Sequence, residues 1–295
     1  MFARQLFLSL LTFLLSISIS VDLDSGVRIM SPNIFTGTVA SNRKDTSETY
    51  HHGTTMSHDV YRGGIFCYMN TKKRKAVIDD GMNPELVRGA DFDGYNGIPV
   101  IKKPDEIIIP KCIVPFSKLS KADKFEDAIA TYEMDQEFSA LLIHPDDYID
   151  DLKKHIFISL DCSLYRNAPY AAQVTNVYRS RAIGCYFQRN GVYVVPQIRW
   201  GNSLTYTTKV FPEKIAFLGV EKHSIVAIGT YGCSQTKDDK YHLKAGLEAM
   251  LETLEPAVVL VYGSMNERVF ADYRNVTKFV HYPDWTTKSH QGGDR

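Results

Sequence analysis

Short, nearly continuous apolar runs recur from residue 140 onward in this 295-residue chain, and they alternate with helical patterns. Such runs are typical of strands covered on both faces, as in parallel sheets. They lie at residues 140–144, 156–161, 192–198, 224–230, 257–263 and 278–282. Helical patterns lie between them at residues 146–154, 169–188 and 239–254. We therefore predict an α/β fold, with a mostly parallel sheet and crossover helices, either open or curled into a partial barrel.

Polar and aromatic residues follow the ends of these runs. In parallel α/β sheets ligands bind at the carboxyl ends of the strands, where the crossover loops converge. The residues at these ends are Asp161, Ser163 and Tyr165, then Arg199, Trp200 and Asn202, then Thr230, Tyr231 and Cys233, and finally Tyr262, Gly263 and Ser264. Asp161 is a candidate general acid or base. The alternative is that its carboxylate caps the following turn. Arg199 beside Trp200 fits an anion with a stacked ring, or alternatively a surface arginine next to a packed tryptophan.

One segment has a one-sided charge. Residues 162–212 contain six basic residues and no carboxylate, although the whole chain balances 34 basic against 34 acidic residues. The bias favours an anionic ligand near this segment. Residues 126–151, however, contain nine acidic residues and no basic one, so the two segments could instead pair with each other.

The helical pattern at residues 169–188 has a polar stripe. Gln173, Asn176 and Ser180 recur at helical spacing, and Arg179 and Arg181 flank them. These side chains are candidates for substrate binding. The alternative is an ordinary solvent-exposed helix face.

The N-terminal part differs from the rest. Residues 1–20 combine Arg4, an apolar run and a small-x-small end, which is typical of a cleaved signal peptide and too short for a stable membrane span. Residues 21–110 are polar and turn-rich, and we predict a partly disordered extension there. An α/β domain is expected at 111–282 and a flexible tail at 283–295. A used signal implies a secreted or membrane-enclosed location, and an unused one implies the cytoplasm.

Familiar reactive motifs are missing from the sequence. The five cysteines are scattered without a C-x-x-C pair, and the group His51, His52 and His58 lacks metal-ligand spacing, so we predict no metal site. Phosphate-binding glycine loops and the esterase elbow are absent too, and the sequence identifies no cofactor. Zero net charge argues against a general nucleic-acid-binding surface.

Several sequence blocks resemble the family known as domain of unknown function 4417, found in bacteria, archaea and phages. The blocks are CIVPFS, SLDCSLYR, PYAAQVTNVYRSR, RWG, SIVAIGTYGC and LEPAVVLVYG, and the resemblance covers roughly residues 111–263. It implies that nine residues occupy motif positions of that family: Asp161, Ser163, Tyr165, Gln173, Asn176, Arg179, Arg181, Trp200 and Gly201. The resemblance implies no activity.

Two hypotheses of function follow. The first is an enzyme acting on a small anionic or nucleotide-like substrate, with Asp161 as acid or base, Arg199 and Arg181 holding the anion, and Trp200 or Tyr165 stacking. The second is a non-catalytic protein of phage or mobile-element type, whose arginines follow the backbone of a single-stranded nucleic acid while aromatic side chains stack on its bases. Convergence of polar groups at strand ends, including Tyr262, favours the enzyme.

Overall fold

The computed structural model describes residues 58–61, 64–67, 81–231, 233 and 235–290. The predicted signal segment at 1–20, most of the predicted extension before residue 81, and residues 291–295 lie outside the described residues, as do His51 and His52. Among the described residues, no helix combines the length and apolar character needed to cross a membrane.

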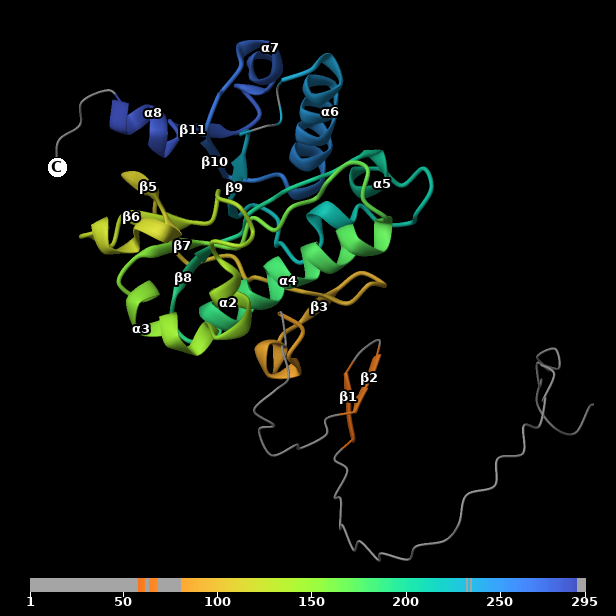
Figure 1. Cartoon of the computed structure of the whole chain (residues 1–295). Helices are drawn as coiled ribbons and strands as arrows, with labels where there is room; N and C mark the ends of the chain where they lie inside the picture. The colour runs from red at the N-terminus through yellow and green to blue at the C-terminus, as the bar shows by residue number, and fades with distance from the viewer. Residues whose placement is uncertain (1–57, 62–63, 68–80, 232, 234, 291–295) are drawn as a thin grey trace, which may run out of the picture. The chain divides into compact units, whose positions relative to one another are not determined.

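The chain forms two short antiparallel strand pairs, β1–β2 and β3–β4, and then parallel strands that alternate with helices (Figure 1). The strands are β1 His58–Tyr61, β2 Gly64–Cys67, β3 Phe92–Asp93, β4 Ile98–Pro99, β5 Cys112–Pro115, β6 Asp127–Ala130, β7 Ile156–Ile158, β8 Tyr193–Val195, β9 Ile225–Gly229, β10 Val258–Tyr262 and β11 Lys278–Tyr282. The α-helices are α2 Ser139–Ile143, α3 Ile149–Leu152, α4 Tyr170–Arg189, α5 Ser203–Tyr206, α6 Lys237–Leu254, α7 Glu267–Phe270 and α8 Trp285–His290. The 3-10 helices are η1 Pro84–Val87, η2 Phe116–Lys121, η3 Pro145–Tyr148, η4 Ile215–Phe217 and η5 Ala271–Tyr273.

The strands from β5 to β11 are all parallel and follow the order of the sequence. β5 to β8 form one hydrogen-bonded sheet and β9 to β11 form another. A parallel bridge joins the two sheets, because the Ile198 amide donates to the Ala227 carbonyl at 2.8 Å and the Ala227 amide donates to the Pro196 carbonyl at 2.9 Å. The predicted parallel α/β fold is confirmed.

The curvature of this arrangement is visible in its core. One face of every strand from β5 to β11 contributes to a single buried cluster, which contains Ile113, Ala128, Ala130, Ile156, Ile158, Val195, Ile225, Ala227, Val258, Leu260, Tyr262 and Tyr282. The alternate residues point outward and pack under helices. Phe157 and Val194 belong to one buried cluster with apolar residues of α4, and Val226 and Val259 belong to another with apolar residues of α6. This alternation produces a partial barrel with helices outside it.

The segment before β5 also belongs to the packed core. A methyl group added at Gly184 of α4 would lie 2.3 Å from Cδ1 of Ile101, so the Ile101 side chain packs directly against the helix backbone there. The side chain of Gln188 pairs with both backbone groups of Lys102 at 2.8 Å. Near the open edge, the Tyr282 hydroxyl donates to the Pro110 carbonyl at 2.6 Å, and Ile107, Ile108 and Ile109 pack against the inner cluster.

Two local predictions of secondary structure need correction. The strand predicted at 140–144 is wrong, because these residues form α2, where Phe138, Leu141 and Leu142 are buried at helical spacing. The helix predicted at 146–154 is two short elements, η3 and α3. β5 and β6 were not predicted, and α8 lies within the residues assigned to a tail.

Candidate functional site

A cavity of about 720 Å³ lies at the carboxyl ends of the barrel strands. Every strand from β5 to β11 delivers lining residues at or just after its end: Pro115 and Ser117, Tyr132 to Gln136, Asp161 and Ser163, Arg199, Gly229 and Tyr231, Tyr262, and Asp284 to Thr286. Parallel strands in sequence order bring all these ends to one rim. The rim is therefore the candidate site, and we call it the mouth cavity.

Asp161 and Arg199 form an ion pair in the mouth cavity. The Arg199 guanidinium donates from Nη1 to Oδ2 of Asp161 at 2.5 Å, and the two side chains are 26% and 8% exposed. The Asp161 carboxylate raises the pKa of Arg199 above its ordinary value. Nε and Nη2 of Arg199 make no hydrogen bond within the described residues. Two donors of a fixed cation therefore remain for a ligand.

Gln197 and Tyr132 complete this network, and sequence reasoning missed both. The Tyr132 hydroxyl donates to Oε1 of Gln197 at 2.6 Å, which turns Nε2 of that amide toward Oδ1 of Asp161 at 3.0 Å. Burial, and then the charge of Asp161, raise the pKa of Tyr132 well above its ordinary value. The Tyr132 ring stacks on Tyr262 with centroids 4.5 Å apart. Asp161 is thus held from two sides.

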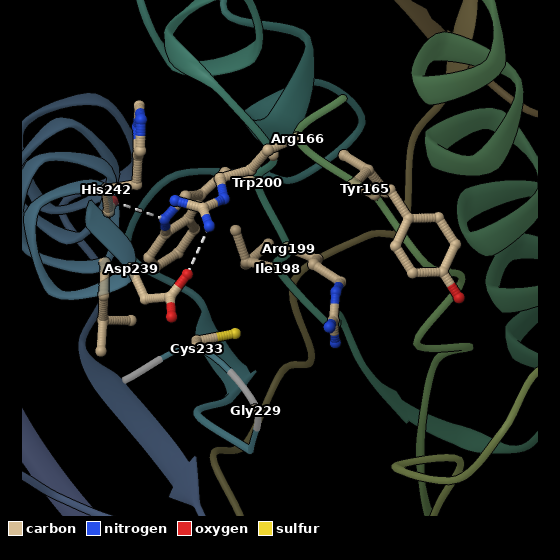
Figure 2. A pocket seen from close by; sticks show the side chains of 12 residues that line it. Tyr165, Arg166, Ile198, Arg199, Trp200, Gly229, Cys233, Asp239 and His242 are labelled. Carbon is tan, nitrogen blue, oxygen red and sulfur yellow. Dashed lines mark hydrogen bonds and ion pairs between the residues drawn. The ribbon is translucent and has the colours of Figure 1, made fainter. Parts of the chain in front are cut away.

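A second cavity, of about 180 Å³, adjoins the first (Figure 2). It shares Tyr165, Arg199 and Gly229 with the mouth cavity and extends toward the N-terminal part of α6. Its other lining residues are Leu164, Arg166, Ile198, Trp200, Gly201, Cys233, Asp239, His242 and Leu243. We call it the indole pocket because Trp200 is its aromatic wall.

The polar stripe of α4 supports the loop that carries Asp161. Gln173 donates to the Ala168 carbonyl at 3.0 Å, Asn176 to the Ser163 carbonyl at 2.7 Å, and Ser180 to the Leu160 carbonyl at 2.6 Å. The alternative of a solvent-exposed face is wrong, since Gln173 and Ser180 are buried. Neither Gln173 nor Asn176 lines either cavity.

The arginines of the basic segment are used in different ways. Arg181 is buried, and it donates to the carbonyls of Leu218, Gln197 and Ala216 at 3.0, 2.6 and 3.2 Å. Burial lowers the pKa of Arg181 to about 10.

The remaining arginines of that segment also have protein partners. Arg166 forms ion pairs with Asp238 and Asp239, and Arg189 donates to backbone carbonyls of η1 and its C-cap. Arg179 donates to the Asn176 side chain at 3.4 Å and lines neither cavity. Of the basic residues that were proposed to bind a ligand, only Arg199 lines a described cavity.

Carboxylates outnumber cations in the mouth cavity. Glu133, Asp135, Asp161 and Asp284 line it, against Lys118 and Arg199. Ser163 donates two hydrogen bonds to the Asp135 carboxylate, from its hydroxyl at 2.7 Å and from its backbone amide at 3.2 Å. The charge balance disfavours a densely phosphorylated ligand and leaves room for a single anionic group at Arg199. Within the described residues, no three His, Cys, Asp or Glu side chains gather to hold a metal ion.

Comparison with known proteins assigns this architecture to a family. The model of the family described as domain of unknown function (DUF4417) matches residues 90–283, more than half of the chain. The chain belongs to this family. The DUF4417 match includes all the mouth residues from Pro115 to Tyr262. The predicted family resemblance is confirmed, and the match begins earlier than the predicted domain.

Phage proteins are among the relatives of this DUF4417 chain. The Gene 1 protein of Mycobacterium phage D29 is 33% identical over 135 residues, which are 45% of this chain and 46% of the phage protein. The Gene 1 protein of Mycobacterium phage L5 is 30% identical over 164 residues, which are 54% of this chain and 69% of that protein. This chain thus spans about half the length of the D29 relative. No solved structure matches it.

Proposed function

We propose that the mouth cavity is the site of an enzyme that acts on a small, nucleotide-like substrate with one anionic group. In this proposal Arg199 binds the anionic group through Nε and Nη2, and Asp161 acts as general acid or base. Tyr165 and Tyr231, exposed at the rim, supply ring faces, and Tyr262 and Tyr132 form the wall.

The Asp161–Arg199 pair is the observation that carries this proposal. Arg199 orients the carboxylate with one nitrogen and makes no other hydrogen bond among the described residues, while Gln197 fixes the second carboxylate oxygen. Each oxygen of Asp161 retains a lone pair for a substrate proton. Such a preorganised pair in a cavity fits acid-base chemistry next to a bound anion.

The single-stranded nucleic-acid alternative has less support. A protein that follows a phosphate backbone needs a row of available cations along a groove. Here Arg166 is paired with aspartates and Arg181 is buried against carbonyls. The carboxylates of the mouth cavity would also repel successive phosphates.

A thermal-shift experiment tests the proposed function. Purified protein is heated with each of the four nucleoside 5′-monophosphates, with ribose 5-phosphate, and with single-stranded DNA at low and high salt. We expect the small phosphates to raise the Tm of wild type and to leave that of Arg199→Met unchanged.

The matched control is Lys209→Ala, an exposed basic residue of the same segment that lines neither cavity. It should behave as wild type. A stabilisation of Arg199→Met equal to that of wild type contradicts the proposal, and so does salt-sensitive binding of DNA with no response to any small phosphate.

A further inference from the structure

The indole pocket has a flat aromatic wall whose position is fixed on both its face and its edge. A methyl group added at Gly246 of α6 would lie 2.2 Å from Nε1, 2.4 Å from Cδ1 and 2.4 Å from Cε2 of Trp200. These nearly equal distances place Gly246 over the face of the five-membered ring. Nε1 also donates to the His242 carbonyl at 2.9 Å. The indole is therefore seated flat on the helix.

The groups around this wall are also immobilised. His242 contacts the Tyr206 hydroxyl through Nδ1 at 2.7 Å, and Asp238 lies 3.7 Å from its Nε2. Asp238 and Asp239 hold the guanidinium of Arg166, as the dashed line to Asp239 in Figure 2 shows. A pocket with one flat aromatic wall and fixed polar groups at its margin fits a planar ring that carries hydrogen-bonding atoms.

Arg199 stands where the two cavities meet. It lines both, together with Tyr165 and Gly229, and its Nε and Nη2 make no hydrogen bond among the described residues. The sugar of a nucleotide lies between its phosphate and its base. With the phosphate at Arg199 on the mouth side, the sugar would cross the junction beside Asp161 and the base would enter the indole pocket.

We propose that the indole pocket is the subsite for the base of a nucleotide, which stacks on Trp200, while Arg199 binds the phosphate and the sugar faces Asp161. This inference rests on the proposed function and adds the substrate class and its orientation. The volume of about 180 Å³ fits a single base.

The chain contains two tryptophans, which makes the test direct. Trp200 lines the indole pocket and Trp285 lines the mouth cavity. The variant Trp285→Phe reports the indole pocket alone through its remaining fluorescence, and Trp200→Phe reports the mouth cavity alone. The probes are the four nucleoside 5′-monophosphates, with ribose 5-phosphate as the matched ligand that lacks a base.

We expect a nucleoside monophosphate to quench the emission of Trp285→Phe and ribose 5-phosphate to leave it unchanged. The preferred nucleotide should bind about tenfold more tightly than ribose 5-phosphate, which is the size of one stacking contact. If nucleotides raise the Tm of wild type but alter only the emission of Trp200→Phe, the base lies in the mouth cavity. The inference is then overturned while the proposed function stands. If no phosphate raises the Tm of wild type, both fall.

Two variants close the indole pocket without replacing either member of the Asp161–Arg199 pair. Gly246→Ala displaces the indole, and Cys233→Phe places a ring in the pocket if the first variant does not fold. In either variant we expect nucleotide affinity to fall about tenfold, to that of ribose 5-phosphate. The control Lys240→Ala, an exposed residue of α6, should keep the preference. An unchanged preference in a folded closing variant contradicts the subsite.

Discussion

Arg181 and Arg199 belong to the same basic segment, yet the fold uses them in opposite ways. Arg181 lies in α4, and its guanidinium donates hydrogen bonds to three backbone carbonyls in the interior. Arg199 follows the end of β8, holds Asp161 with one nitrogen and keeps other donors for the cavities. Whether an arginine of this segment supports the fold or faces a cavity therefore depends on its position relative to a strand end. The charge composition of the segment does not distinguish the two roles.

The same contrast holds between the two regions that contain them. In the α4 region, the side chains of Gln173, Asn176 and Ser180 donate hydrogen bonds to backbone carbonyls of the segment that follows β7. The strand-end region, with Asp161 and Arg199, lines the mouth cavity. Substitutions in the first region should therefore act on stability, and substitutions in the second should act on ligand binding.

The largest effect is expected for Arg181→Met. The change leaves the carbonyls of Gln197, Leu218 and Ala216 buried without their donor, which should lower the free energy of unfolding by about 3 kcal/mol. Urea unfolding measures this loss, and the folded fraction should still bind nucleotides. Arg189→Met, at an exposed site, should cost less than about 1 kcal/mol. Equal losses in the two variants would contradict a structural role specific to Arg181.

Arg199→Met should show a smaller loss of stability together with a loss of binding. Asp161, which is only 8% exposed, then lacks its ion partner, and the partly buried pair is expected to contribute about 2 kcal/mol. The double variant Asp161→Asn/Arg199→Met should recover part of that stability, because the uncompensated charge is gone. A double-mutant cycle with no coupling between the two sites would refute the pairing.

Gln173→Met should change the free energy of unfolding by no more than about 1 kcal/mol and leave ligand binding intact. The substitution removes the bond from Nε2 to the Ala168 carbonyl at 3.0 Å. It also removes Oε1, a buried acceptor without a hydrogen-bond partner among the described residues. The two effects oppose each other. Urea unfolding and calorimetry check the result, and a loss of binding would move Gln173 into the site.

The smallest effect concerns alkaline pH. Burial raises the pKa of Tyr132, so the folded chain keeps this phenol protonated where the unfolded chain ionises it. The associated stability is present below the unfolded pKa of about 10 and is lost as the pH rises further. Between about pH 8 and 11, wild type should lose up to about 1 kcal/mol more than Tyr132→Phe. Identical pH profiles would show that Tyr132 does not contribute.

Much of the architecture could be predicted from local sequence. The apolar runs of β7 to β11 and the periodic patterns of α4 and α6 contain enough residues to reveal their type. β5 and β6 are only four residues long, and β6 begins with a charged residue, so no run stands out there. Residues 140–144 were ambiguous because a short apolar run fits either a strand or a buried helix turn.

The candidate site was predictable only in part. Asp161, Arg199 and Tyr262 were found because they follow recognisable strands, and the structure brings them to one cavity. Tyr132 was missed because its strand, β6, was not recognised; the same rule would have found it. Gln197 lies inside an apolar run, and only the three-dimensional contact with Asp161 reveals it. The sequence could not distinguish the polar stripe of α4 from a ligand-binding face. The partners of the stripe are backbone carbonyls, and every residue type has one.

Calorimetric titration of Arg199→Met and Gln173→Met with the nucleoside monophosphate that most stabilises wild type tests the central claim most directly. If ligands bind at the strand ends, the binding heat disappears in Arg199→Met and keeps its wild-type affinity in Gln173→Met. Binding that survives in Arg199→Met, or that is lost in a folded Gln173→Met, would place the ligand elsewhere and contradict the account.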